Sequence, residues 1–299
     1  MEQKLHKPEW LKIKLTTNDN FADIKTTLKK HQLHTVCEEA HCPNISECWN
    51  TGTATFMLMG DTCTRGCKFC AVKTGNPMKK LDAEEPKKLA QALAEIKLFD
   101  YVVLTSVNRD DLVDGGSSHF AECIKEIKKA YPNIIVEVLI PDFKGDVEAL
   151  KKIIEAKPEV IAHNIETIER LQKKVRDPRA NYKQSLCVLE NVKKMNPKIY
   201  TKSSIMLGLG ETDEEVIQSM KDLRAIGVQI LTLGQYLRPT DWHIPISSFV
   251  EPSKFEYFKQ KGLELGFLFL AAGPFVRSSY KAGELFMKNI ISKNKGIKL

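Results

Sequence analysis

From residue 54 onward, the chain alternates between two patterns of hydrophobic and polar positions. Short apolar or β-branched runs predict β-strands, and segments whose apolar residues recur every three or four positions predict amphipathic helices. The predicted strands span residues 55–59, 101–105, 134–140, 160–163, 200–207 and 229–233. The predicted helices span residues 85–97, 119–131, 147–155, 168–175, 182–195 and 213–226. This alternation indicates βα units and a mainly parallel sheet.

Two helix starts carry local signals that agree with the periodicity. Thr212 and Glu215 have the spacing of a capping box, in which each side chain bonds the backbone of the other residue. Asp146 is an N-cap candidate for the helix that begins at residue 147. The residues that follow Thr212 on one apolar face are Val216, Met220 and Leu223.

Six βα units are fewer than the eight of a closed barrel, so the sequence predicts an α/β fold with an open, partial (βα)6 TIM-like barrel over residues 54–235. A flat doubly wound sheet is the rival fold, but no GxGxxG or Walker A motif follows a strand. Residues 1–53 form a predicted N-terminal extension that carries cluster ligands. Residues 236–299, with a predicted helix at 253–265 and an apolar run at 267–272, form a predicted C-terminal closing segment.

The composition predicts a globular protein. Of the 299 residues, 42% are hydrophobic and 28% are charged, which argues against disordered, collagenous and coiled-coil chains. The net charge of +7 is spread along the chain, so solvated helix faces are the simplest interpretation, although an acidic partner or a nucleic acid stays possible.

The chain has neither an apolar run long enough for a membrane span nor an N-terminal signal pattern. We therefore expect a cytoplasmic protein whose thiols stay reduced. For its eight cysteines, metal binding or redox chemistry is expected before disulfides.

Cys63, Cys67 and Cys70 form a CxxxCxxC motif directly after the first predicted strand of the barrel. Three thiolates on one short loop suit a [4Fe–4S] cluster that keeps one iron open, whereas a structural zinc normally takes four protein ligands. An open iron can chelate the amino and carboxylate groups of S-adenosylmethionine, and reduction then releases a 5′-deoxyadenosyl radical. The spacing therefore favours radical chemistry.

Cys37, Cys42 and Cys48 form a second triplet, CxxxxCxxxxxC, in the N-terminal extension. This spacing fits neither a zinc knuckle nor the common ferredoxin run, and a chance or structural grouping stays open. We expect a second cluster here. The role of this second cluster would be electron transfer, substrate binding or sulfur supply.

The CxxxCxFC motif after a first strand, followed by βα units, resembles the radical S-adenosylmethionine (radical SAM) superfamily. Within it, the resemblance narrows to the lipoyl synthase family and covers nearly the whole chain. The blocks that carry it, in order, are CEEAHCPNISECW, GDTCTRGCKFCAV, TSVNRDDLVDGG, AHNIET, VRDPRANY, KSSIMLGLGE, LTLGQYLRP and GPFVRSSYKAGE.

The resemblance implies that Cys37, Cys42 and Cys48 hold an auxiliary [4Fe–4S] cluster, with Ser279 as its unusual fourth ligand. From the residues alone, Ser278 and Ser279 would be interpreted as local caps. A seryl oxygen binds iron less strongly than a thiolate, which suits a cluster that must be dismantled.

The resemblance also suggests which residues contact S-adenosylmethionine. Phe69 and Met206 are expected near the adenine, and Ser106, Asn164 and Glu166 near the ribose or methionyl groups. From the residues alone, core packing of Met206 and a helix-start role of Glu166 stay open. The family commonly has Asp at position 108, where this chain has Asn108.

The activity implied by the resemblance is insertion of two sulfur atoms at C6 and C8 of a protein-bound octanoyl-lysine, with the auxiliary cluster as sulfur donor. Implied partners are an octanoylated lipoyl carrier domain, from a 2-oxoacid dehydrogenase E2 or a glycine cleavage H protein, and an electron donor such as ferredoxin or flavodoxin. No nucleic acid or membrane partner is expected. The alternatives are a tRNA-modifying radical SAM methylthiotransferase, although no RNA-binding module is obvious, and a non-catalytic iron–sulfur carrier.

The remaining candidates are weighed mainly from local pattern. Cys123 and Cys187 stand among apolar residues and are predicted to be core residues. His163 ends a strand and is a candidate to face the site. Arg109, with the two aspartates that follow it, either orients substrate or forms a salt-bridge network within its loop.

Overall fold

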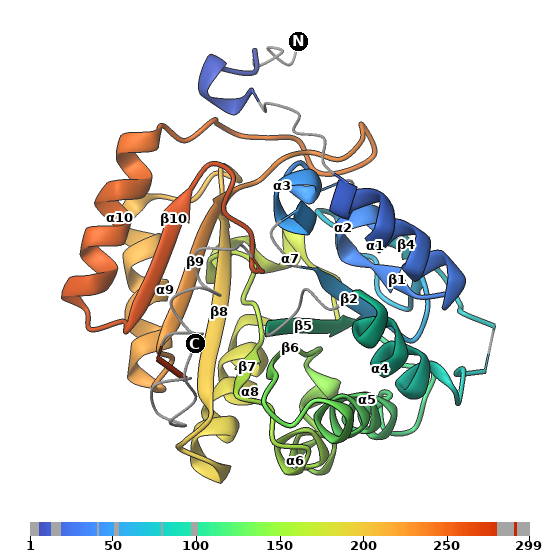
Figure 1. Ribbon diagram of the computed structural model, residues 1–299. Helices are drawn as coiled ribbons and strands as arrows, with labels where there is room; N and C mark the ends of the chain where they lie inside the picture. The colour runs from blue at the N-terminus through green and yellow to red at the C-terminus, as the bar shows by residue number, and fades with distance from the viewer. Residues whose placement is uncertain are drawn as a thin grey trace.

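One eight-stranded sheet organises the molecule (Figure 1). The computed structural model describes residues 6–12, 19–40, 42–50, 54–78, 80–96, 101–279 and 290–291. In strand order, the sheet contains β1 (His34–Thr35), β2 (Thr55–Leu58), β5 (Tyr101–Ser106), β6 (Ile135–Leu139), β7 (Val160–Ala162), β8 (Tyr200–Leu207), β9 (Ile230–Gln235) and β10 (Phe269–Gly273). Neighbours from β2 to β10 are parallel, and β1 pairs antiparallel with β2. Because β1 and β10 end the strand order on opposite sides, the described sheet is open.

Each parallel connection passes through a helix on the outer side of the curved sheet (Figure 1). These helices are α4 (Glu85–Ile96), α5 (Ser117–Ala130), α6 (Val147–Glu155), α8 (Tyr182–Met195), α9 (Asp213–Ala225) and α10 (Pro252–Glu264). The architecture is the predicted α/β partial barrel. Among the described residues, no helix has the length and apolar character needed to cross a membrane.

Short elements complete the chain. In the N-terminal region, η1 (Glu9–Leu11) precedes α1 (Asp19–Lys30), α2 (Val36–Glu39) and α3 (Ile45–Asn50). Trp49 of α3 is fully buried, and its ring centroid lies 4.9 Å from that of Phe21 in α1. The other short elements are β3 (Thr62–Cys63), β4 (Lys73–Thr74), η2 (Phe143–Gly145), η3 (Glu169–Leu171) and α7 (Gln172–Val175).

The six strands expected from the hydrophobic pattern are all present, with ends that differ by up to two residues. Thr212 and Glu215 form the predicted capping box, and the side chain of Asp146 accepts a hydrogen bond from the backbone of Glu148. The segment 168–175 differs, because it forms η3 and the short α7 instead of one helix. The two capping signals could be predicted from the sequence because both partners of each hydrogen bond lie within three residues of each other.

The C-terminal segment differs from the expectation of a separate closing element. β10 pairs in parallel register with β9, from Phe269 opposite Ile230 to Gly273 opposite Gly234. The α10–β10 unit therefore extends the sheet by one parallel strand. The boundaries proposed at residues 53 and 235 stay predictions.

Cys187 was wrongly predicted to be a core residue. The buried positions of α8 recur as Tyr182, Ser185, Val188, Leu189 and Val192, which lie on one helix face. Cys187 stands between apolar residues in sequence but falls outside that face, and it is exposed. An apolar run does not define a face.

Alternation along the parallel strands separates two sets of side chains. One set packs against the helices, with Val102, Val136 and Val138 in the same apolar cluster as Phe120 and Ile153. The other set faces the inside of the curved sheet. Towards the carboxyl ends of the strands it includes Met57, Thr105, Leu139, Asn164, Ser204, Met206 and Gly234, which line a cavity.

A buried ion pair occupies the next inward positions below this cavity. Lys202 Nζ on β8 lies 2.6 Å from Glu137 Oε1 on β6, and both side chains are only 2% exposed. Tyr101 Oη on β5 donates a hydrogen bond of 2.5 Å to Glu137 Oε2. The pair therefore joins three strands inside the barrel.

We expect Lys202→Met to lower the free energy of unfolding by about 3–5 kcal/mol, because the carboxylate of Glu137 would stay buried without its cation. Combining it with Glu137→Leu should recover most of the loss, as measured by urea unfolding. The control is Lys194→Met, which removes an exposed pair with Glu190 and should cost less than about 1 kcal/mol. Equal losses in Lys202→Met and Lys194→Met would contradict the prediction.

Candidate active site

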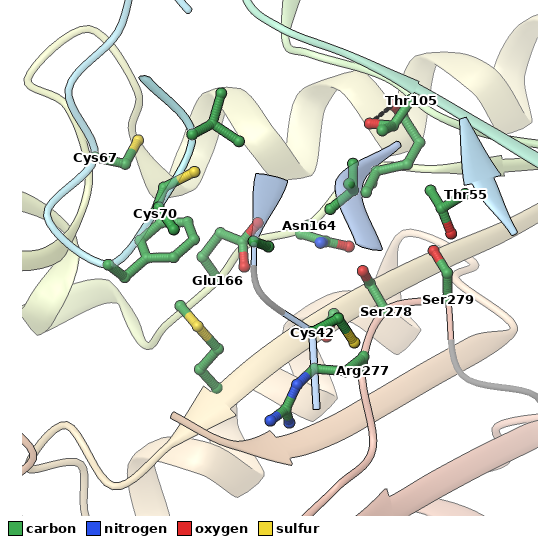
Figure 2. A pocket seen from close by; sticks show the side chains of 18 of the residues that line it. Cys42, Thr55, Cys67, Cys70, Thr105, Asn164, Glu166, Arg277, Ser278 and Ser279 are labelled. Atoms are coloured by element: carbon green, nitrogen blue, oxygen red, sulfur yellow. Dashed lines mark hydrogen bonds between the residues drawn. The ribbon is translucent and has the colours of Figure 1, made fainter. Parts of the chain in front are cut away.

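The cavity at the carboxyl ends of the strands has a volume of about 580 Å³. It contains side chains from the N-terminal region, the CxxxCxxC loop, the barrel strands and the C-terminal segment. The residues predicted from sequence that line it are Cys37, Cys42, Cys48, Cys63, Cys67, Phe69, Cys70, Ser106, Asn164, Glu166, Met206 and Ser279. Figure 2 shows Cys67 and Cys70 on one side, Cys42, Ser278 and Ser279 on the other, and Asn164 and Glu166 between them. Their individual roles stay predictions.

Backbone N–H groups point at two thiols of the CxxxCxxC loop. Arg65 N and Asn108 N donate to Cys63 Sγ at 3.4 and 3.3 Å, and Asp177 N donates to Cys67 Sγ at 3.3 Å. Such donors favour thiolate over thiol, because the negative sulfur is the better acceptor. The contacts of Asn108 use its backbone, so they do not depend on whether residue 108 carries a carboxylate.

For two thiols of this loop, burial acts in the opposite direction. It raises the pKa of Cys67 to about 11 and the pKa of Cys70 to about 12. These two side chains are therefore neutral at pH 7 when they bind no metal, and iron binding must release their protons. Three thiols on one loop with N–H donors already on two sulfurs fit the ligand set of an iron–sulfur cluster.

Two buried polar atoms in the cavity lack partners among the described residues. Ser106 is the last residue of β5 and Asn164 follows β7. Neither Ser106 Oγ nor Asn164 Oδ1 takes part in a hydrogen bond with the described residues. Buried polar atoms are nearly always hydrogen-bonded, so these two call for a polar ligand. This part of the cavity fits a molecule with hydroxyl, amino or carboxylate groups, as S-adenosylmethionine has.

Glu166 is held in the cavity by an unusual backbone conformation. Its φ of +65° lies in the left-handed region, which costs energy for any residue but glycine. Hydrogen bonds from its N–H to Ser204 O (3.1 Å) and from Met206 N to its carbonyl (2.9 Å) fix it beside β8. Burial raises the pKa of its carboxyl group, and the cation of Arg176 opposes that shift. Since the next helix begins at Glu169, the alternative helix-start role of Glu166 is wrong.

The second cysteine triplet is built on two short helices. Cys37 lies in α2 and Cys48 in α3, with Cys42 in the turn between them. Cys42 N donates to Cys37 O at 3.0 Å, and Cys48 N donates to Asn44 O at 2.9 Å. Burial raises the pKa of the Cys42 thiol. Backbone turns thus bring three cysteines at irregular spacing to one wall of the cavity.

The C-terminal segment reaches this wall by crossing β9. A Cβ atom on Gly234 would stand 2.0 Å from Val276 O, so only glycine permits the crossing. Asn44 Nδ2 donates to Phe275 O at 2.7 Å, and the partly buried Arg277 donates to Val276 O at 2.8 Å. These contacts carry the two serines that follow Arg277 into the cavity beside Cys42 (Figure 2). The rest of the GPFVRSSYKAGE block, from residue 280, lies outside the described residues.

The loop after β5 forms a salt-bridge network, one of the two alternatives expected for it. Arg109 Nη2 pairs with Asp111 Oδ2 at 2.8 Å. Asp110 forms an ion pair with Arg65 instead. Arg65 stands between the first two cysteines of the CxxxCxxC motif. Arg65, Asn44 and Gly234 were not among the residues predicted from the sequence, although each lies inside one of the family-like blocks.

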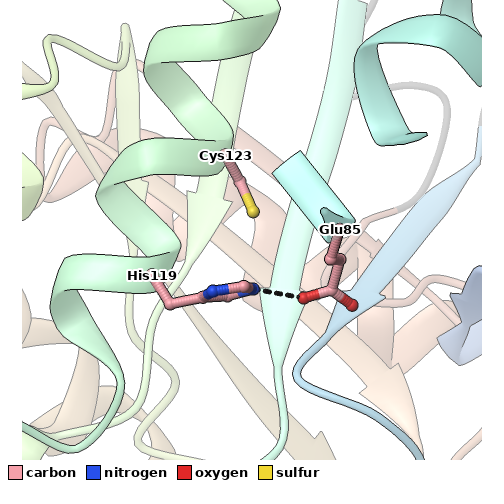
Figure 3. A group of neighbouring side chains, drawn as sticks. All are labelled: Glu85, His119 and Cys123. Atoms are coloured by element: carbon pink, nitrogen blue, oxygen red, sulfur yellow. Dashed lines mark hydrogen bonds and ion pairs between the residues drawn. The ribbon is translucent and has the colours of Figure 1, made fainter. Parts of the chain in front are cut away.

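A separate polar group lies behind the cavity. His119 and Cys123 of α5 point toward Glu85 at the start of α4 (Figure 3), with ligand atoms of the three residues within 4.8 Å of one another. His119 Nε2 lies 2.5 Å from Glu85 Oε2, and Met59 N donates to the same carboxylate at 3.0 Å. These bonds satisfy the carboxylate and tie both helices to the end of β2. Cys123 is fully buried, as predicted.

Comparison with known proteins finds relatives over most of the chain. Residues 57–223 match the radical SAM superfamily, and residues 1–42 match the N-terminal domain of lipoyl synthase of the radical SAM family. Identity is 55% to an apicoplast lipoyl synthase of Plasmodium vivax, over 98% of this chain and 66% of the relative. Identity is 54% to a mitochondrial lipoyl synthase of Rattus norvegicus, over 98% of this chain and 80% of the relative. It is 55% to a lipoyl synthase of Anaeromyxobacter, over 94% of this chain and 95% of the relative. The chain thus spans about two thirds of the length of the Plasmodium relative.

Solved structures share the fold at low sequence identity. Methylornithine synthase superposes with a TM-score of 0.53 at 14% identity, over 93% of both chains. SuiB of Streptococcus suis, solved with bound S-adenosylmethionine, gives a TM-score of 0.56 at 9% identity, over 77% of this chain and 53% of that one. At these identities the likeness concerns the architecture alone.

We expect the free energy of unfolding to fall between pH 6.5 and about pH 4 because of His163. This cavity residue lies between Ile140 O and Ser185 Oγ, each 2.9 Å from a ring nitrogen, and burial lowers its pKa to about 4. In that window the unfolded chain binds a proton that the folded chain does not, so stability is lost as pH falls, by up to about 3 kcal/mol.

Urea unfolding of the parent and of His163→Gln, at matched cluster content and at pH 7.5 and 5, measures this effect. The variant should lose less stability between the two pH values than the parent. Identical losses would contradict the assignment of the acid sensitivity to His163.

We expect Asn44→Ala to release the C-terminal segment, since Phe275 O would lose its buried donor at a cost of about 1–3 kcal/mol. Limited proteolysis should then cut faster near residues 274–279. Asn191→Ala, which alters an amide on the surface of α8, is the control and should be cut at the parental rate. Parental protection of Asn44→Ala would show that other contacts hold the segment.

Proposed function

Because this chain belongs to the lipoyl synthase family of the radical SAM superfamily, we propose that it inserts two sulfur atoms at C6 and C8 of an octanoyl chain carried on a protein lysine. The observation that carries the proposal is the meeting of two cysteine triplets, from segments separated in sequence, in one cavity. A single triplet would serve hydrogen abstraction alone. If each triplet binds a cluster, a radical source and a sulfur source would lie within reach of the same substrate.

Cys63, Cys67 and Cys70 are the proposed ligands of the radical-generating cluster. When bound, a [4Fe–4S] cluster with S-adenosylmethionine supplies a 5′-deoxyadenosyl radical that removes hydrogen from an unactivated carbon. The unpartnered Ser106 Oγ and Asn164 Oδ1 would orient the polar groups of S-adenosylmethionine. Glu166 would contribute to the same subsite, and Phe69 and Met206 would offer apolar contacts to its adenine.

Cys37, Cys42 and Cys48 are the proposed ligands of a second [4Fe–4S] cluster, which enters the reaction as the sulfur substrate. Ser279 is the proposed fourth ligand. Its segment is fixed by backbone contacts of its neighbours, so the seryl oxygen can be exchanged without disturbing the fold. A hydroxyl is a weaker ligand for iron than a thiolate, and it suits a cluster whose sulfide is consumed.

The cavity also offers room for an alkyl chain. Apolar residues from several elements contribute to the cavity lining. These residues include Val36, Ile45, Val107, Leu139 and Ile140. An octanoyl chain laid along them would bury apolar surface, worth about 0.8 kcal/mol per methylene group.

The partners follow from this activity as proposals. An octanoylated lipoyl carrier domain, of an E2 or H protein, would present the chain, and the net charge of +7 would favour an acidic carrier. Ferredoxin or flavodoxin would supply electrons. We also retain the cytoplasmic location as a proposal, although two of the relatives are named for the apicoplast and the mitochondrion.

We expect the two triplets to separate radical formation from sulfur insertion. Changing Cys63, Cys67 and Cys70 to Ala should abolish cleavage of S-adenosylmethionine and leave about four of about eight irons. The same change at the other triplet should leave 5′-deoxyadenosine formation under strong reductant but give no thiolated octanoyl-lysyl peptide. Mass analysis of 5′-deoxyadenosine and of the octanoyl-lysyl peptide measures the two steps separately. Cys187→Ala, at an exposed thiol outside the cavity, is the matched control and should behave as the parent.

The sulfur source and the serine ligand are tested in the same assay. With ³⁴S placed in the cluster sulfide, a single turnover should put the label at both product positions. Ser279→Ala should resemble loss of the second triplet, and Ser278→Ala should be milder. Unlabelled product with the second cluster intact would overturn the sacrificial role.

A further inference from the structure

Arg65 stands between Cys63 and Cys67 and is one of the most buried cations of the described chain, with its side chain 3% exposed. Its guanidinium is held by two carboxylates at once. Nε and Nη2 donate to Asp110 at 2.8 and 3.0 Å, and Nη1 and Nη2 donate to Asp142 at 2.7 and 2.8 Å. Such forked pairs fix orientation as well as charge. We call Arg65, Asp110 and Asp142 the guanidinium clamp.

The clamp fastens the cysteine loop to the barrel. Asp110 follows β5 and Asp142 follows β6, so Arg65 ties the loop after β2 to the ends of the next two strands. Asp142 Oδ2 also accepts a hydrogen bond of 2.6 Å from Gln184 Nε2 on α8. Thr64 Oγ1 donates to Asp110 Oδ2 at 3.2 Å. The loop is therefore anchored to the segments that follow β5 and β6, and through Asp142 to α8.

A second ion pair holds the other side of the loop. Asp177 Oδ2 accepts a hydrogen bond of 2.8 Å from Gly66 N. Arg179 donates from Nε and Nη2 to the carboxylate of Asp177, at 2.8 and 3.0 Å, and from Nη2 to Thr64 O at 2.7 Å. Arg179 also lies 3.2 Å from Asp110, which joins it to the guanidinium clamp.

The residues held in this way are those whose backbones face the thiols. Arg65 N and Asp177 N each donate to a cysteine sulfur, and Asn108, the third donor, stands two residues before Asp110. Hydrogen bonds to cluster sulfurs and nearby charges are among the factors that set the reduction potential of an iron–sulfur cluster. N–H donors withdraw charge from thiolate sulfur and favour the reduced, more negative state.

We infer that Arg65 is a positioning residue that keeps these three N–H groups on Cys63 and Cys67, and thereby holds the reduction potential of the cluster at this loop above the value it would have on a loose loop. The inference rests on the proposed function only as far as Cys63, Cys67 and Cys70 bind that cluster. Arg179 acts in the same direction through Asp177. Its effect is smaller, because its side chain is 50% exposed and the pair is partly screened by water.

Arg65→Lys separates geometry from charge. Lysine keeps the positive charge but is a point donor that cannot fork to two carboxylates. At a fixed solution potential we expect the ratio of reduced to oxidised cluster to fall about tenfold, which corresponds to 59 mV for a one-electron couple. Redox titration followed by electron paramagnetic resonance measures this ratio. Couplings from exchangeable protons near the reduced cluster should also weaken.

Arg170→Lys is the matched control. Arg170 makes a forked pair with Glu215 at 2.6 and 2.8 Å, but it is exposed and shares no residue with the cysteine loop. It should titrate at the parental potential. If Arg65→Lys fails to retain a cluster, Arg179→Lys, at a half-exposed side chain, tests the inference instead. Its reduction potential should shift in the same direction by a smaller amount.

Parental potential and parental proton couplings in Arg65→Lys, at full cluster content, would overturn the inference. An equal shift in Arg170→Lys would do the same, because it would show a general effect of losing a forked pair. The titration needs no octanoyl substrate. Failure of the proposed sulfur insertion would therefore appear in the parent's products, whereas failure of this inference would appear only in the potentials of the variants.

Discussion

The two-residue period of the parallel strands is the constraint on which the rest of the molecule depends. Because alternate side chains face opposite sides of the sheet, one set must pack against the helices and the other must share the inside of the barrel. At the carboxyl ends this inner set includes Thr105, Asn164, Ser204 and Met206, which line the cavity. Two positions further in, Glu137 and Lys202 can be polar because they satisfy each other. A shift of register by one residue would exchange the core and the site.

The open sheet gives the terminal segments their role. Six βα units leave one side of the barrel unclosed, and α2, α3 and the segment 274–279 supply cavity walls there. These walls are joined by few but specific contacts, such as the bond from Asn44 to Phe275 O and the close crossing of Val276 over Gly234. The second cysteine triplet and the seryl side chains are therefore brought to one cavity by long-range contacts.

Charged side chains also hold the CxxxCxxC loop in place. A short loop that presents three thiols to a cavity leaves many backbone groups without secondary-structure partners. Asp110, Asp142 and Asp177 accept hydrogen bonds from this loop, and Arg65 and Arg179 balance most of their charge. The loop can thus be rigid without being part of the sheet.

The sequence by itself determined the elements whose causes are local: the strand and helix pattern, the capping box at Thr212, and the two cysteine spacings with the chemistry they imply. The tertiary structure decided what depends on partners far apart in the chain. Arg65 could be seen between two cysteines, but its carboxylates lie 45 and 77 residues away. Cys187 was misplaced because an apolar run does not show which helix face meets the core, and β10 was missed as a strand of the sheet because pairing is not a local property. Ser279 was predicted only through the resemblance, since the contact that brings its segment to the cavity joins residues 231 positions apart. Long-range contacts are selected by packing of the whole chain, and no local pattern encodes them.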